Sequence, residues 1–256
     1  MCKTKISVAI FSNPMRLLLL FVVLLAASCG RVGDPLPPVR HRALVPEQLR
    51  VIQRGDALIL SWPKPSASAM QDSKVVRAEI LRRDEAASEP ARLPEERFLE
   101  EARVIGFISA KDISGTEART LFYADRLPIE AVAGNDIRFR YAIRYVNLTG
   151  SPLPLSNYAL LEPLTSIARP PSEPHIAITQ DAIKLSWQAP TANIDDSQPP
   201  LVIGYNVYRR TKDQAFPDQP LNSTPITGTS FEDRKFKFGS EYIYLVRSVS
   251  QGKEST

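Results

Sequence analysis

A seven-residue segment occurs twice in the chain and limits its possible folds more than any other feature. Residues 56–62 read DALILSW, and residues 181–187 read DAIKLSW. Each copy ends in a tryptophan, Trp62 or Trp187, and the chain has no others. In both copies apolar residues recur at every second position, which places them on one face of a strand. The repeat therefore predicts two half-buried strands at equivalent places in two similar domains.

Three further pairs of segments follow this repeat in the same order. They are residues 77–83 with 204–210, 123–125 with 231–233, and 139–145 with 242–248. All are short and rich in aromatic and β-branched residues, and Pro, Gly and Asn lie between them. This pattern predicts an all-β fold with two tandem β-sandwiches, over residues 47–163 and 175–256.

These segments resemble the fibronectin type III family, which has an immunoglobulin-like fold. The resemblance implies that Trp62 and Trp187 are core residues of the second strand. It also implies that Trp187 packs under Tyr242, which closes the sandwich as a tyrosine corner with a backbone acceptor at Phe236. In the first copy, Phe139 stands in place of Tyr242 and has no hydroxyl group.

The first copy contains an insertion, residues 84–102, that is rich in Glu, Arg and Ala. Within it, residues 94–102 begin with a proline and two acids, a pattern typical of the first turn of a helix. Residues 103–108 return to a strand pattern. Between the two copies, residues 164–174 contain three prolines and predict a semi-rigid linker.

The N-terminus predicts export and a lipid anchor. Residues 17–27 are continuously apolar after basic Lys3, Lys5 and Arg16, but this run is shorter than the roughly 20 residues of a membrane span. The following Ala-Ala-Ser-Cys resembles a bacterial lipobox. We therefore expect residues 1–28 to be a signal peptide, with Cys29 as the lipidated first residue of the mature chain.

Residues 29–46 contain four prolines and predict an extended stalk. At about 3.1 Å per residue, such a stalk reaches roughly 50 Å from the lipid. Gly30 follows the cysteine in place of the Asp that retains lipoproteins in the inner membrane, so we expect the outer membrane. Removing three basic residues with the leader lowers the formal charge from +4 to +1, which gives no reason to expect nucleic acid.

The sequence offers little for catalysis or metal binding. His41 and His175 lie in Pro-rich segments, and the mature chain has no cysteine besides Cys29, so neither a zinc site nor a disulfide is expected. Asp195 and Asp196 with a nearby Asn are weak candidates for calcium, because the ligand spacing is wrong. We expect no cofactor and no enzymatic activity.

Two short motifs have structural explanations. Arg54-Gly55-Asp56 matches an integrin-binding tripeptide, but it lies where a tight turn joins two strands, and Gly and Asp favour such turns. Asn147 and Asn222 each begin a glycosylation sequon, which carries no presumption of use in a bacterial lipoprotein.

The sequence thus predicts a non-enzymatic lipoprotein of the cell envelope, whose two sandwiches act as a spacer and as protein- or glycan-binding units. No sequence feature singles out one binding partner among proteins and polysaccharides. The alternative is that they form the N-terminal, carbohydrate-targeting part of a longer exported hydrolase, with catalytic sequence beyond Thr256.

The two copies differ in the sequence that follows their long C-terminal strand. In the first copy, residues 156–161 read as a final strand after the one at 138–146. In the second copy, residues 251–256 follow the equivalent strand and suffice for a turn. We therefore expect the second sandwich to lack a counterpart of the strand at residues 156–161, so that either the chain continues past Thr256 or a partner donates a strand.

Overall fold

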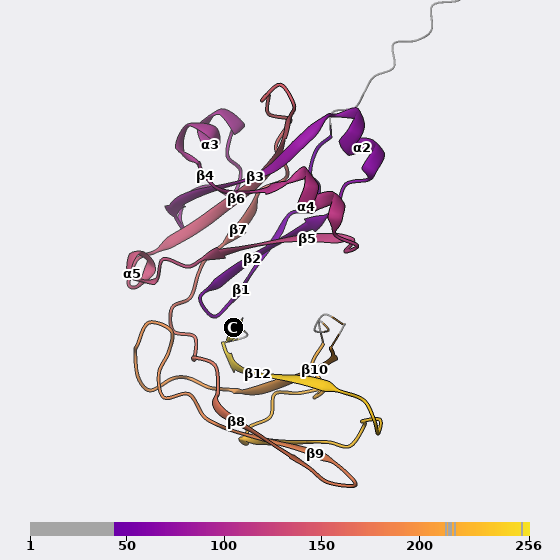
Figure 1. The fold of residues 1–256 in the computed structure, drawn as a ribbon. Coiled ribbons are helices and arrows are strands. Elements are labelled where there is room, and N and C mark those ends of the chain that lie inside the picture. Colours follow the sequence, from indigo (N-terminus) through magenta and orange to yellow (C-terminus); the bar gives the residue numbers. More distant parts are fainter. Residues whose placement is uncertain (1–43, 213, 215–216, 218, 252) are drawn as a thin grey trace, which may run out of the picture. The chain divides into compact units, whose positions relative to one another are not determined.

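The computed structural model describes residues 44–212, 214, 217, 219–251 and 253–256 (Figure 1). The predicted signal peptide, Cys29, His41 and nearly all of the predicted stalk lie outside the described residues. Among the described helices, none has both the length and the apolar character of a membrane span. The fold is all-β, with two tandem immunoglobulin-like β-sandwiches, as predicted.

The first sandwich has two antiparallel sheets. One contains β1 (Arg50–Arg54), β2 (Ala57–Pro63) and β5 (Thr120–Arg126). The other has the order β4 (Arg103–Ser109), β3 (Val75–Ala86), β6 (Ile137–Asn147) and β7 (Ala159–Leu161). The turn between β1 and β2 is made by Gly55 and Asp56, and Gly55 has a φ of +52°, as its place in a tight turn requires.

The second sandwich repeats this order. One sheet contains β8 (Ser172–Ile178), β9 (Ile183–Gln188) and β11 (Ser230–Asp233). The other contains β10 (Gly204–Thr211), β12 (Tyr242–Ser250) and β13 (Lys253–Glu254). β13 also pairs with β1 between Glu254 and Arg54. The predicted repeat is confirmed: β2, β3, β5 and β6 are matched by β9, β10, β11 and β12.

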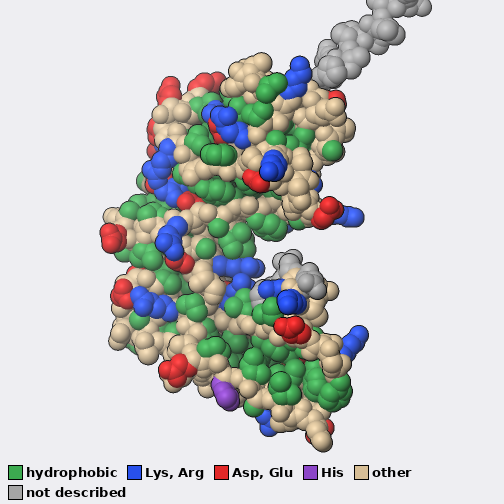
Figure 2. Space-filling model, viewed as in Figure 1, with side chains coloured by type: hydrophobic (Ala, Val, Ile, Leu, Met, Phe, Trp, Pro, Cys, Tyr) green, Lys and Arg blue, Asp and Glu red, His purple; other side chains and the backbone are tan. Residues whose placement is uncertain are grey.

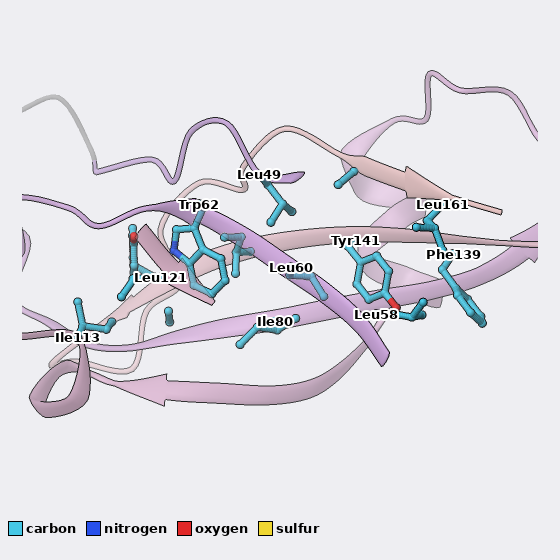
Figure 3. Packing of buried hydrophobic residues seen from close by; sticks show 14 of the residues in the cluster. Leu49, Leu58, Leu60, Trp62, Ile80, Ile113, Leu121, Phe139, Tyr141 and Leu161 are labelled. Carbon is cyan, nitrogen blue, oxygen red and sulfur yellow. The ribbon is translucent and has the colours of Figure 1, made fainter. Parts of the chain in front are cut away.

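The core of the first sandwich lies between its two sheets (Figure 3). Leu58, Leu60 and Trp62 point inward from β2, and the side chain of Trp62 is among the largest that are fully buried. From β6, the alternate residues Phe139, Tyr141, Ile143 and Tyr145 face the same core. The core thus forms because inward-facing apolar and aromatic residues occupy alternate positions along both β2 and β6.

The insertion covers part of the outer face of the β4-β3-β6-β7 sheet. The predicted helix is present as α3 (Glu95–Glu101), and its Phe98 is fully buried. Phe98 packs with Leu93 of the insertion, and with Leu81 and Ala142, which are paired on β3 and β6. The other helices of this sandwich are α2 (Ala67–Asp72), α4 (Ala110–Gly115) and α5 (Ile129–Val132).

A buried ionic cluster fastens the insertion to this face. The side chain of Glu85 on β3 is fully buried and accepts hydrogen bonds from Arg138 and Arg140 of β6 and from Arg83. Arg140 also donates to the backbone carbonyls of Pro90 and Ala91, at 2.6 and 2.7 Å. The two arginines therefore neutralise Glu85 and bind the insertion backbone at the same time.

The linker prediction is wrong in part. Within residues 164–174, Ile167 and Ala168 are fully buried. The Ala168 N–H donates to Ser250 Oγ at 3.0 Å, and Ser248 Oγ donates to the Arg169 carbonyl at 2.9 Å. The serine hydroxyl groups of β12 satisfy the linker backbone, so this segment packs as part of the second sandwich, and β8 begins at Ser172, before the predicted boundary at residue 175.

The expectation that residues 251–256 form only a turn is also wrong. Lys253 and Glu254 form β13, which pairs with the last two residues of β12. The chain reverses at Gln251, which has a φ of +45°, and the Ser255 N–H then donates to the Ser248 carbonyl at 2.9 Å. A short final strand is therefore present, and it covers only one end of β12.

Candidate binding groove

A groove of about 310 Å³ lies along β12 in the second sandwich, and we call it the edge groove. Figure 2 shows that hydrophobic side chains gather on the exposed surface of this sandwich. The groove is mostly apolar, as binding sites generally are. Its lining residues are Pro170, Pro171, Pro174, His175, Ile176, Leu185, Ser186, Trp187, Tyr244, Leu245, Val246 and Thr256.

One wall of the edge groove comes from the repeated segment. Leu185 and Trp187 point inward from β9 and are 4% and 5% exposed. The ring that lies edge-on to Trp187 belongs to Tyr205, with centroids 5.3 Å apart and planes at 66°. Trp187 and Leu185 thus form, with Tyr205 and Val207, the small core of the second sandwich.

Tyr242 is placed differently from the expectation. It is half-buried, and its hydroxyl oxygen accepts a hydrogen bond from the Lys237 N–H at 3.1 Å. The guanidinium of Arg209 lies over its ring, 4.6 Å from the centroid. The tyrosine corner therefore exists, but its backbone partner is the Lys237 donor and not an acceptor at Phe236, and Tyr205 takes the place beside Trp187.

The other wall of the edge groove is the backbone edge of β12. Hydrogen bonds in an antiparallel pair alternate between the two sides of a strand. Ser248 directs its N–H to Ser255 Oγ and its carbonyl to the Ser255 N–H, away from β10. The amide groups of Val246, Tyr244 and Tyr242 point to this same edge. Within the described residues, β10 is the strand neighbour of this part of β12.

A polar triad holds Tyr244 in place beneath the groove. Tyr244 Oη donates to Asp233 Oδ2 at 2.7 Å, and Arg209 Nη1 donates to the same oxygen at 2.5 Å. Burial would raise the pKa of Asp233, but the hydrogen bonds from Tyr244, Lys235 N–H and Arg209 outweigh it and lower that pKa. Burial, together with Asp233, raises the pKa of Tyr244. The triad ties β10, β11 and β12 together.

The first sandwich contains the same triad. Tyr141 Oη donates to Asp125 Oδ2 at 2.8 Å, and Arg82 Nη1 donates to that oxygen at 2.6 Å. Arg82 also lies over the ring of Phe139, as Arg209 lies over Tyr242. Sequence reasoning missed this triad, although all three pairs of residues fall within the aligned segments 77–83, 123–125 and 139–145.

In the first sandwich the equivalent groove is closed. There β7 pairs with β6, with Ala159 opposite Tyr141 and Leu161 opposite Phe139. Asn157 then bridges the remaining gap, because its side chain accepts from the Leu49 N–H at 2.9 Å and donates to the Leu49 carbonyl at 3.0 Å. The first sandwich thus shows what fills this position in a closed domain.

The solvent exposure of β8 and β12 reflects this difference between the two sandwiches. All seven residues of β8 are exposed, including Ile176 at 49% and Ile178 at 77%. In the first sandwich, Leu49 beside β1 is only 3% exposed. Along β12, residues 242–247 are half-buried and residues 248–250, where β13 pairs, are buried. Among the residues that the structure describes, the second sandwich is therefore open along the edge of β12 beyond β13.

The other residues singled out in the sequence have local partners. Asp195 accepts from Ser197, and Asp196 pairs with Arg169. Asn147 accepts from the N–H groups of Thr149 and Ser151, and Asn222 pairs with the β10 backbone.

Within the described part of the chain, no three His, Cys, Asp or Glu side chains lie close enough to hold a metal ion. His175 is exposed at the rim of the edge groove.

No protein-family model matches the chain. Among solved structures it is similar to the FN1–FN3 domains of chicken CNTN1, with 13% identity and a TM-score of 0.32, over 84% of this chain and 63% of that one. A two-domain fibronectin type III segment of chicken tenascin has 15% identity and a TM-score of 0.29, with 82% and 94% covered.

A pectate lyase, Pel3 from Pectobacterium carotovorum, has 18% identity and a TM-score of 0.27, with 47% and 29% covered. These similarities are too low to support a function. The fold assignment rests on the strand order of the two sandwiches themselves.

Proposed function

We propose that this protein is a non-enzymatic lipoprotein of the bacterial outer membrane, anchored through Cys29, whose second sandwich binds a partner in the cell envelope. The first sandwich acts as a spacer on the Pro-rich stalk. The observation that carries this proposal is the apolar edge groove of the second sandwich, which lies beside β8, a strand whose seven residues are all exposed.

The spacer role is supported by how thoroughly the first sandwich is closed. Asn157 closes one edge, as described above. At the other edge, Tyr123 of β5 donates to the Ile105 carbonyl of β4 at 3.0 Å. Gly106 makes room for this contact, because a Cβ atom there would lie 2.1 Å from Tyr123 Oη. The insertion covers part of the outer face of the β4-β3-β6-β7 sheet.

Site-specific crosslinking in cells tests the anchor and the binding surface together. A photoreactive amino acid replaces Ile176 at the edge groove or, as a matched control, Phe107, which is 65% exposed on β4. We expect a discrete crosslinked envelope product from position 176 and none from position 107. The same strains are fed labelled palmitate and fractionated, and Cys29→Ser should abolish both labelling and membrane association.

Two results would contradict the proposal. If Cys29→Ser protein still takes up the lipid label and sediments with membranes, the anchor lies elsewhere. If positions 176 and 107 give the same crosslinking pattern, the edge groove is not the binding surface of the second sandwich.

A further inference from the structure

We propose that a second site, which we call the junction hollow, binds an oxyanion: a carboxylate or phosphate group carried by a small organic molecule. The hollow has a volume of about 370 Å³ and lies where β13 pairs with β1. Its lining residues are Ile52, Gln53, Arg54, Asn206, Tyr208, Val249, Lys253 and Glu254. This inference does not rest on the edge groove or on the function proposed for it.

Hydrogen bonds hold the β1 wall of the junction hollow in place. Beside the pairing of β1 with β13, the Gly55 N–H donates to the Glu254 carbonyl at 2.8 Å. The side chain of Gln53 is buried and makes two bonds to one backbone unit. Its Nε2 donates to the Leu164 carbonyl at 2.7 Å, and its Oε1 accepts from the Leu164 N–H at 2.9 Å. A ligand therefore meets a preformed wall, which lowers the cost of ordering the site on binding.

The floor of the junction hollow is the face of β10 and β12 that is turned away from the core of the second sandwich. Asn206 lies opposite Arg247, and Val249 lies opposite Glu254. Residues that lie directly opposite each other share a face of the sheet. On this face Glu254 Oε1 accepts from Asn206 Nδ2 at 2.6 Å and from Tyr208 Oη at 2.5 Å. The carboxylate is thus already held by its neighbours.

Positive charge exceeds negative charge at the junction hollow. Arg54 and Lys253 line it, and a third cation, Arg247, packs against two of its lining residues. The guanidinium of Arg247 lies 5.0 Å from the ring centroid of Tyr208, and its Nη1 lies 3.7 Å from Glu254 Oε2. Three cations therefore meet one carboxylate, and a concave site with such an excess attracts anions.

Arg247 is the cation with the poorest compensation. Its side chain is 11% exposed, and within the described residues nothing accepts a hydrogen bond from its buried Nε. Burial lowers the pKa of Arg247 and the nearby charge of Arg54 lowers it further, whereas Glu254 and Tyr208 act in the opposite direction. Since buried charges are normally paired, an anion beside Arg54 would supply the missing compensation.

The walls of the junction hollow indicate the kind of anion. Arg54 and Lys253 are half-buried, so their charged ends can reach a ligand. A guanidinium binds carboxylate and phosphate groups through two parallel hydrogen bonds. Beside these charges lie the apolar side chain of Ile52, which is 47% exposed, and the amide of Asn206. The volume is in the range of small-molecule sites, so the anion should be carried by an organic body such as a sugar.

Titration with sugars that differ in charge tests this inference. The full mature chain, residues 29–256 with Cys29→Ser to keep it in solution, is titrated with glucose 6-phosphate, with glucuronate and, as a neutral control, with glucose. The Nε–H signals of Arg54 and Arg247 are followed by NMR. We expect saturable shifts of both signals with at least one of the two anions and none with glucose. The anion that binds more tightly identifies phosphate or carboxylate as the preferred group.

Two variants test whether the anion binds in the junction hollow. Arg54→Gln and Lys253→Gln should each weaken binding by about tenfold or more, because each removes a charged hydrogen-bond donor. Both side chains are half-buried, so both variants should fold. The matched control is Arg234→Gln, which removes the same charge from a side chain that is 70% exposed and pairs with Glu232. It should change the affinity by less than about twofold.

Two results would overturn the inference. One is that neither anion shifts the Arg54 and Arg247 signals more than glucose does. The other is that Arg54→Gln and Lys253→Gln bind the anion as tightly as Arg234→Gln, which would place the anion elsewhere. Crosslinking from position 176 is scored separately, so either result would leave the proposed function standing.

Discussion

At the scale of single residues, Glu85 is the group on which the insertion of the first sandwich depends. Burial would raise the pKa of Glu85, but the hydrogen bonds and charges of Arg140 and Arg138 outweigh it and hold the pKa below its ordinary value. Removing one partner of a buried ion pair costs about 3–5 kcal/mol, because the other charges stay buried.

We therefore expect Glu85→Gln to lower the free energy of unfolding by about this amount at neutral pH, as measured by urea denaturation. Since the pKa of Glu85 is lower in the folded state, its contribution is complete above an unfolded pKa of about 4.3 and is lost as the pH falls toward the folded value. The pH dependence of stability below about pH 4 should thus be flatter in Glu85→Gln than in the wild type.

Glu95→Gln, an exposed glutamate of α3, is the control and should leave the profile unchanged. A Glu85→Gln protein as stable as the wild type would show that the three arginines do not need this carboxylate.

At the scale of elements, α3 has one buried side chain, the aromatic ring of Phe98, and its Glu101 also pairs with Arg83 of β3 at 2.6 Å. Phe98 packs with Tyr158, their ring centroids 4.9 Å apart, and with Leu81 of β3. We expect Phe98→Ala to release the insertion from the sheet, since a buried phenylalanine contributes about 3–5 kcal/mol. Limited proteolysis should then cut within residues 87–102 much faster than in the wild type.

The matched control is Leu99→Ala, which changes the neighbouring residue of the same helix, 38% exposed. It should leave the cleavage rate unchanged. Equal cleavage of Phe98→Ala and wild type would mean that the Glu85 cluster alone holds the insertion.

The strands were predictable for a physical reason, because alternate apolar residues reveal a buried face whatever it packs against. The location of α3 was also predictable, from Pro94 and the acids that follow it. Its packing was not, since Leu81 and Ala142 lie on the outer face of the sheet and read as ordinary strand residues. The triads were hidden for a similar reason: Asp125 and Asp233 look like turn acids until the fold brings an arginine and a tyrosine to each.

The edge groove itself was only half predictable. The sequence predicted a strand at residues 242–250 and only a turn after it. It did not indicate β13, which depends on the chain reversing at Gln251 and on serine hydroxyl groups within β12. Nor did it indicate that the predicted linker would pack against the same serines and bring Pro170 and Pro171 to the groove.

At the scale of the whole molecule, the two sandwiches have separate hydrophobic cores. Trp62 belongs to a cluster with Leu58, Leu60 and Ile113, and Trp187 belongs to another with Leu185 and Tyr205, and the clusters share no residue. We expect Trp62→Ala and Trp187→Ala each to destabilise its own sandwich by about 3–5 kcal/mol, as for other large core side chains. The effects of the two substitutions should add to within about 0.5 kcal/mol in the double variant, because the sites share no partners. Amide exchange resolved by sandwich provides the measurement: Trp187→Ala should speed exchange in β9 and β10 and leave β2 and β6 protected. Loss of protection in β6 on changing Trp187 would show that the sandwiches unfold as one cooperative unit.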